Sequence, residues 1–326
     1  MESSLGTDIS ALRKKENNAS LLSLGLVYTL LILCFWGYAQ QNMMMLPPLI
    51  FLMGVVQYYI VISGHEAVHK TLCASKKANE FFGVMGQSMV GVNFNAYRLQ
   101  HMDHHRCSSH EQDPDAHIYM KVMSVPAGWR RFLYLVFGTF IEIVIKIHQK
   151  GSGGYGTDRK IKPDVARKMK RDSLLVIMAQ LSIMGLSFLC VGGLPVELPL
   201  PEFMTFILGL VWSYALVWIV PLFCVTVFLN RCRIVIEHGL AYCIAQKMDN
   251  FGGPRIPTID IVPHPIERII FAPFRFNYHC AHHLFMAVPH YLLPELHKLL
   301  QDHAHEGHHY IQGGYIRALM RAMKEP

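Results

Sequence analysis

Four long apolar segments constrain this chain of 326 residues more than any other feature. They cover residues 21–38, 48–63, 173–193 and 203–229. A helix that crosses a bilayer needs about 20 apolar residues, because each residue advances the axis by about 1.5 Å. Charged residues make up only 16% of the chain, whereas soluble domains contain about 25%. The sequence therefore predicts an all-α integral membrane protein with four transmembrane helices.

Two further apolar runs, residues 81–94 and 132–147, fit a span less well. The first is short and contains three glycines, and the second contains Glu142 and Lys146. We expect both to lie at the membrane interface or to pack on a cytosolic part of the protein. No linker separates a second soluble domain, so we expect a single membrane domain over residues 1–326. Residues 1–20 form its polar cytosolic N-terminus, and residues 301–326 form a cytosolic tail.

Basic residues in the connections predict the orientation of these spans. Residues 130–171 contain eleven Lys and Arg residues, whereas the connections at residues 40–47 and 194–201 contain none. Loops rich in Lys and Arg remain on the cytoplasmic side of a membrane. We therefore expect both termini and the long middle region to be cytosolic. The net charge of +7 then reflects orientation and contact with anionic lipid, and not nucleic-acid binding.

Three histidine clusters would all lie on this cytosolic side. An HxxxH motif contains His65 and His69, and two HxxHH motifs contain the remaining members: His101, His104 and His105, then His279, His282 and His283. On a helix, residues at i and i+3 or i+4 share a face and can bind one ion together. Eight clustered imidazoles exceed what a single ion binds, so the sequence predicts a cytosolic helical cap that holds a two-metal site.

Several other residues are candidates for the same site. His238 follows the fourth apolar segment on the cytosolic side, and we expect it to be a ninth ligand. Asp113 and Asp115, in a turn after the second cluster, could accept hydrogen bonds from ligand rings; Glu237 and Asn277 are further candidates for such contacts. In contrast, we expect the histidines at 303, 305, 308 and 309 to form a solvated face. The eight cysteines contain no CxxC pair, so reduced thiols are expected.

These motifs resemble those of the membrane-bound fatty acid desaturase superfamily, whose members carry three histidine boxes. The stretch 277–297, NYHCAHHLFMAVPHYLLPELH, is especially similar to the third-box region of bacterial and plastid-type desaturases. The resemblance covers about residues 64–300 and implies a non-haem diiron centre with O2 as cosubstrate. It also implies that a histidine before the third box, here His238, completes the ligand set. A bacterial inner membrane is the expected location, in preference to the endoplasmic reticulum.

The resemblance implies oxygen-dependent desaturation of a fatty acyl chain, linked to lipid, CoA or a carrier protein. Two features depart from many relatives. Ala281 replaces a Glu or Gln before the final histidine pair, which removes a polar contact. No cytochrome b5-like HPGG motif occurs, since His264 and Pro265 are followed by Ile and Glu. Electrons must then come from a separate partner, of the ferredoxin or cytochrome b5 type with its reductase.

Three alternatives remain open from the sequence. A fatty-acyl or carotenoid hydroxylase or ketolase of the same superfamily would use the same boxes. A zinc-dependent membrane hydrolase would need only three protein ligands and a bound water on its ion. A metal transporter or sensor would place its ligands inside the spans, whereas here they follow the ends of the spans. Iron pairs with open positions fit the number of histidines best.

Overall fold

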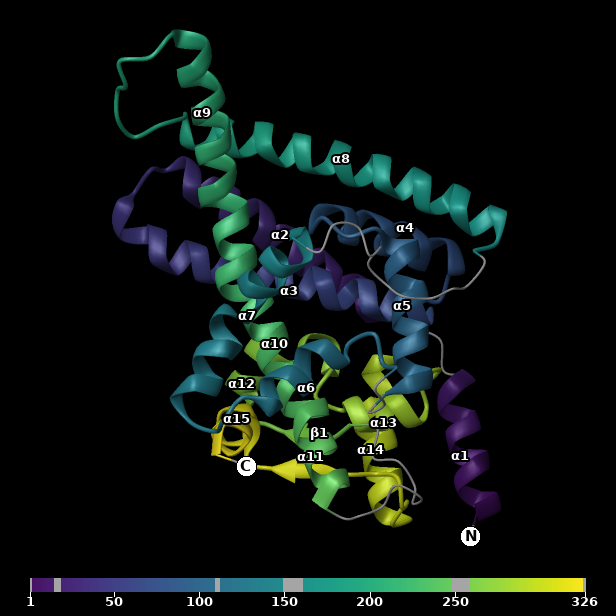
Figure 1. The fold of residues 1–326 in the computed structure, drawn as a ribbon. Helices are drawn as coiled ribbons and strands as arrows, with labels where there is room; N and C mark the ends of the chain where they lie inside the picture. Colours follow the sequence, from purple (N-terminus) through teal and green to yellow (C-terminus); the bar gives the residue numbers. More distant parts are fainter. Residues whose placement is uncertain (1, 15–18, 109–111, 149–160, 248–257, 325–326) are drawn as a thin grey trace. The chain divides into compact units, whose positions relative to one another are not determined.

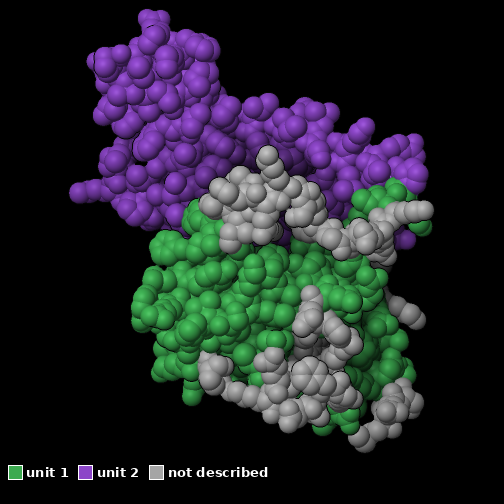
Figure 2. Space-filling view, viewed as in Figure 1, with its two compact units in different colours: residues 1–16, 97–162, 228–326 green, residues 17–96, 163–227 purple. Residues whose placement is uncertain are grey.

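The computed structural model describes residues 2–14, 19–108, 112–148, 161–247 and 258–324. Within these residues the chain is mainly helical (Figure 1). It separates into two compact units, coloured in Figure 2. Unit 1 contains residues 1–16, 97–162 and 228–326, and unit 2 contains residues 17–96 and 163–227. Each unit is therefore built from segments that are distant in sequence.

Unit 2 contains the apolar helices. Among the described residues, four helical stretches are long and apolar enough to cross a membrane: Ala19–Ala39, Met43–His69, Pro163–Val191 and Glu202–Ile244. Each overlaps one of the four apolar segments identified in the sequence, so the prediction of four helices able to cross a membrane is confirmed at the level of length and composition. The last stretch continues past residue 227, where unit 2 ends. The elements of unit 2 are α2 (Ala19–Ala39), η1 (Met43–Met45), α3 (Leu46–His69), α4 (Lys76–Met89), α8 (Pro163–Val191), α9 (Glu202–Tyr214), η2 (Ala215–Ile219) and η3 (Leu222–Val227).

Local sequence explains where α3 begins and ends. Pro47 and Pro48 occupy its first turn, where a missing N–H costs nothing. Lys70 adopts a left-handed conformation at φ 63° and closes the C-terminus directly after His69. The His65 and His69 pair thus lies in the last turn of α3. Residues 81–94 contribute to α4 and to the start of α5 (Phe94–Cys107), and neither helix is among the candidate spans.

Unit 1 is built from shorter elements. After Tyr97 in α5 it contains α6 (Ala116–Ser124) and α7 (Trp129–His148), which includes residues 132–147 and is not a candidate span among the described residues. The remaining elements are α1 (Glu2–Lys14), α10 (Phe228–Ile234), η4 (Val235–Gly239), α11 (Leu240–Lys247), β1 (Asp260–Val262), α12 (Pro265–Phe271), η5 (Pro273–Arg275), α13 (His279–Leu284), η6 (His290–Leu292), α14 (Leu293–Asp302), β2 (Tyr310–Gln312) and α15 (Gly314–Lys324).

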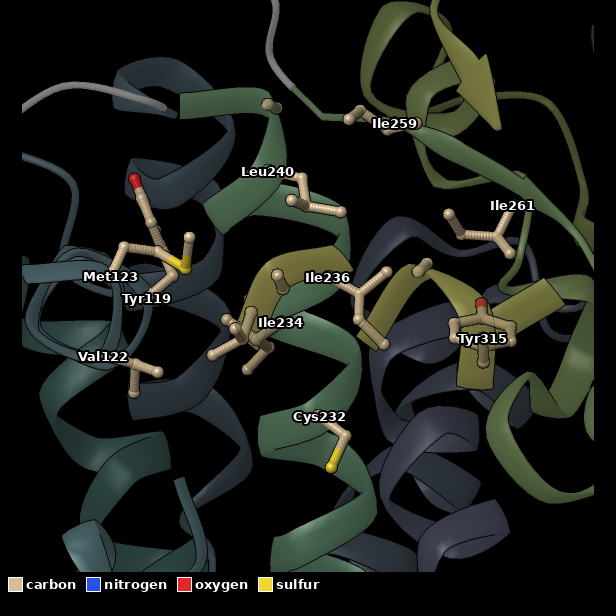
Figure 3. Close-up of a cluster of buried hydrophobic side chains, with 14 of the residues drawn as sticks. Tyr119, Val122, Met123, Cys232, Ile234, Ile236, Leu240, Ile259, Ile261 and Tyr315 are labelled. Carbon is tan, nitrogen blue, oxygen red and sulfur yellow. The ribbon is translucent and has the colours of Figure 1, made fainter. Parts of the chain in front are cut away.

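The main apolar core of unit 1 surrounds α10 and η4. Tyr119 and Met123 of α6 lie on one side of Ile234 and Ile236, and Tyr315 of α15 lies on the other (Figure 3). A second cluster joins α1 to α13 and α14 through Ile9, Leu12, Ala281, Leu293 and Leu296. Because α15 belongs to the first core, the C-terminal residues are part of the folded unit.

Two expectations from the sequence are wrong in detail. The chain is not strictly all-α, because β1 and β2 form a two-stranded parallel sheet with Ile261 opposite Ile311. Strands of three residues are too short to produce a recognisable alternating pattern. The tail is not a solvated face throughout either, since the side chain of His308 is only 2% exposed. Its Nε2 lies 2.8 Å from Oδ2 of Asp260, a residue 48 positions earlier in the chain.

Candidate metal centre

The third histidine box lies on α13, which is held in place by a carboxylate. Asp260 Oδ1 accepts hydrogen bonds from the backbone N–H groups of Cys280 and Ala281, at 2.6 and 3.1 Å. These donors lie in the first turn of α13, where backbone N–H groups have no partner within the helix. The helix then places His279, His282 and His283 at i, i+3 and i+4. Ala281 packs in the α1, α13 and α14 cluster, an apolar position.

The second box lies near the end of α5. Nδ1 of His104 donates to Asp113 Oδ1 at 2.8 Å, and Tyr119 donates its hydroxyl to Asp113 Oδ2 at 2.8 Å. Asp115 Oδ2 lies farther away, 3.8 Å from His104 Nδ1, and Asp115 Oδ1 accepts from Gln100. Asp113 therefore fixes both the orientation of the His104 ring and the nitrogen that carries its proton. The other nitrogen, Nε2, is left with a lone pair for an ion.

His238 lies in η4, a single turn of π-helix inside a longer helix. Such turns insert one extra residue and re-aim a side chain, and they occur frequently at functional sites. Nε2 of His238 lies 3.0 Å from Nε2 of His279, and its Nδ1 lies 3.4 Å from the Ser108 hydroxyl. The ring of His238 also stacks on Tyr119, with centroids 5.5 Å apart.

Seven histidines of unit 1 form two groups of facing rings. In the first group, ligand atoms of His104, His238, His279 and His283 all lie within 4.8 Å of one another. In the second, the same limit holds for His101, His105 and His282. The Nε2 atoms of His101 and His105 are 3.0 Å apart. The two groups are adjacent, because the His105 and His283 rings stack at 4.1 Å.

His65 and His69 lie one turn apart on α3 of unit 2. Their ring centroids are 4.9 Å apart, as expected for i and i+4 on a helix. Nδ1 of His65 donates to Glu66 Oε1 at 2.9 Å, and the Thr71 hydroxyl donates to Glu66 Oε2 at 2.8 Å. The carboxylate of Glu66 thus orients one ring of the pair, a role the HxxxH spacing does not reveal.

The protonation of the buried rings suits metal binding. Burial and the neighbouring imidazoles hold the pKa of His279 and of His283 well below the usual histidine value. Burial also lowers the pKa of His104, but its hydrogen bond to Asp113 and the charges of Asp115 and Asp113 outweigh this, so its pKa is raised overall. Neutral imidazoles offer lone pairs at nitrogens that already approach one another. The donor set therefore fits transition-metal ions such as iron or zinc, which bind imidazole well.

The remaining candidates lie farther from the rings. Glu237 Oε2 is 4.0 Å from His279 Nε2, and this carboxylate accepts hydrogen bonds from Arg233 and Tyr315, at 2.6 and 2.8 Å. Asn277 donates to the Ile261 carbonyl at 3.0 Å and so attaches the segment before α13 to β1. Sequence reasoning missed Asp260, Glu66 and Tyr119. Asp260 has no recognisable spacing from the boxes, whereas Glu66 lies inside the HxxxH motif.

Comparison with known proteins assigns a family to this arrangement. The sequence profile of the family described as "Fatty acid desaturase" matches residues 41–314. The matched region includes all three boxes, His238, Asp113 and Asp260. A search of curated proteins finds no match to the chain. The family match covers most of the chain, and the second and third boxes contribute facing imidazoles within unit 1, so this protein belongs to the membrane fatty acid desaturase superfamily.

Proposed function

We propose that this chain catalyses the oxygen-dependent desaturation of a fatty acyl chain at a pair of iron ions, with electrons from an external donor. Membership of the family implies an oxidoreductase. The observation that carries the proposal is the pair of adjacent imidazole groups in unit 1, which supply ligands for two ions. A single zinc ion that activates water would use three protein ligands, so a zinc hydrolase would leave most of these rings without a role.

The ligands we propose are the nine histidines identified from the sequence. His104, His238, His279 and His283 would hold one ion, and His101, His105 and His282 would hold the other. His65 and His69 complete the set through their i, i+4 pairing at the end of α3. When bound, the iron pair supplies activation of O2 and cleavage of an unactivated C–H bond. The irons themselves are inferred from the family and from the donor set.

The protein's own residues orient the ligands. Asp113 holds the proton of His104 on Nδ1, and Tyr119 fixes the second oxygen of that carboxylate. Glu66 does the same for His65, and Asp260 fixes the first turn of α13. Such contacts to ligands typically affect metal affinity or activity by 10- to 100-fold. Since the substrate methylene carries no acidic proton, the chain contributes positioning and exclusion of water, and no acid–base group is needed.

Hydroxylation is the second candidate reaction, because the same family also contains hydroxylases and ketolases. Loss of a second hydrogen from the acyl chain gives an alkene, whereas addition of oxygen gives an alcohol. For either reaction we propose a separate electron donor, of the ferredoxin or cytochrome b5 type. No residue named above separates desaturation from hydroxylation. The two reactions are therefore distinguished by their products.

The test is lipid profiling by mass spectrometry of a host that expresses the chain together with a suitable electron donor. We expect a new monounsaturated acyl species with wild type and none with His104→Ala, while both proteins accumulate in the membrane. His303→Ala is the matched control, since His303 lies outside the boxes and donates to the Leu299 carbonyl. Hydroxylated acyl chains would favour the second reaction. Full activity in His104→Ala would refute the role of the second box.

A further inference from the structure

A third cluster of metal-binding side chains lies in unit 1, separate from the histidine boxes. It contains Asp260 of β1, His297 of α14 and His308 shortly before β2. Asp260 Oδ2 lies 2.6 Å from His297 Nδ1 and 2.8 Å from His308 Nε2, and the two nitrogens are 3.1 Å apart. The side chains are 0%, 8% and 2% exposed, respectively. Three ligand atoms thus meet at one buried point.

Hydrogen bonds in this triangle converge on one carboxylate oxygen. The other carboxylate oxygen, Oδ1, is already occupied by the N–H groups of Cys280 and Ala281, so only Oδ2 faces the rings. If both ring nitrogens carry protons, both donate to the single oxygen Oδ2, and the two nitrogens lie only 3.1 Å apart. If only one carries a proton, the lone pair of the other faces the carboxylate oxygen, a repulsive contact in a buried site.

A divalent cation can take the place of these protons, because all three atoms can direct lone pairs to it. Zinc binds imidazole nitrogen and carboxylate oxygen at about 2.0–2.2 Å, usually with four ligands. Tetrahedral bonds of that length place ligand atoms roughly 3.3 Å apart. The observed separations of 2.6, 2.8 and 3.1 Å are shorter than this, so the two rings would rotate outward to admit an ion. Two neutral imidazoles and one carboxylate leave a fourth position for water.

We propose that Asp260, His297 and His308 bind one structural divalent transition-metal ion, with zinc the best match to the donors. The ion would join β1, α14 and the segment that leads into β2. These elements are short, and small loop-rich regions are often stabilised by such an ion. Through Oδ1 of Asp260 the same site is connected to α13, so the ion would also stiffen the helix that carries the third box. This proposal is independent of the reaction catalysed.

The test is elemental analysis of the full-length protein, purified in detergent and equilibrated with Zn2+ before unbound metal is removed. We expect His297→Gln and His308→Gln each to contain one metal ion per chain fewer than wild type. The double variant should also lose one ion and not two, because the ligands share it. His303→Gln and His305→Gln, histidines of the same tail outside the triangle, should retain the wild-type content. Content unchanged in His308→Gln would overturn the proposal.

A second variant covers the case in which His308→Gln does not fold. His308→Cys keeps a metal ligand at this position, and thiolate bound to Co2+ produces a near-ultraviolet charge-transfer absorption. We expect this absorption in the Co2+-loaded variant and not in Co2+-loaded wild type, whose proposed ligands include no cysteine. A folded His308→Cys protein without the absorption would show that the triangle is held by hydrogen bonds only. A His104→Ala background separates the outcome from the boxes, since it alters only the proposed catalytic ions.

Discussion

At the residue scale, His290 is a buried histidine that takes no part in the proposed ligand set. It follows the third box and packs edge-on against Phe274, with centroids 5.2 Å apart. Burial and the positive charge of Arg275 lower the pKa of His290 to about 4. In the unfolded chain its pKa returns to the usual value of about 6.5. The ring is therefore neutral in the folded protein near pH 7.

This difference predicts a loss of stability in acid. Between pH 6.5 and 4 the unfolded chain binds a proton at His290 that the folded chain excludes, so the free energy of unfolding falls as pH falls. At about 1.4 kcal/mol per pKa unit, the full effect is roughly 3 kcal/mol. We expect the melting temperature of wild type to fall more steeply than that of His290→Gln across this range. Parallel melting curves for the two proteins would contradict the assignment.

At the element scale, α3 packs against the fourth apolar segment through a glycine and two polar side chains. A Cβ atom at Gly54 would lie 2.3 Å from Val225 Cβ and 2.8 Å from the Pro221 carbonyl oxygen. Beside this contact, Thr226 donates to the Gly54 carbonyl at 2.7 Å, and Gln57 donates to the Trp218 carbonyl at 3.0 Å. Small residues and hydrogen bonds of this kind hold apolar helices together where no hydrophobic force acts between them.

We therefore expect Gly54→Ala to destabilise the protein by about 1–3 kcal/mol, the usual cost of overpacking. The neighbours that the added methyl would meet are a β-branched side chain and backbone, and neither moves easily. Gly25→Ala is the matched control, since nothing lies within 4 Å of its Cβ position on α2. The melting temperature of each variant in detergent can be measured by monitoring the exposure of its cysteines during heating. Equal melting temperatures would show that this contact is loose.

At the scale of the whole molecule, the number of candidate spans is even. The described residues contain four such helices, and the connections with and without Lys or Arg alternate between them. An even number of spans would place both termini on one side of the membrane, and the basic connections favour the cytosol for that side. Within the bounds of the candidate spans, His65, His69 and His238 lie near the ends, and the other six proposed ligands lie outside these spans.

This topology predicts which of three positions, the two termini and residue 197, a reagent can reach from the cytosolic side. In sealed vesicles with the cytosolic face outward, tags at both termini should be removed by added protease. A cysteine introduced by Glu197→Cys, in the connection without basic residues, should react with an impermeant maleimide only after the vesicles are opened. A protected tag at one terminus would mean an odd number of spans.

The boxes and spans were predictable from the sequence because their patterns are local. Imidazoles at i, i+3 and i+4 share a helical face whatever surrounds them, and a run of about 20 apolar residues is long enough to cross a bilayer by itself. The sequence also indicated His238 and Asp113, which lie close to spans or boxes along the chain. Glu237 precedes His238, and Asn277 lies two residues before the third box, but these positions did not reveal their partners. Glu237 accepts hydrogen bonds from Arg233 and Tyr315, and Asn277 donates to β1.

Only the tertiary structure decided which distant residues meet. Asp260 contacts His308 across 48 residues and the third box across 20, and Tyr315 reaches Glu237 across 78. No periodicity encodes such pairs, because they arise when β1, β2 and α15 close against α10 and η4. The sequence by itself thus determined the spacing of the histidines within each box and the four long apolar helices. The folded chain decided how the donors are oriented, and it turned a tail that seemed solvated from its composition into part of a buried site.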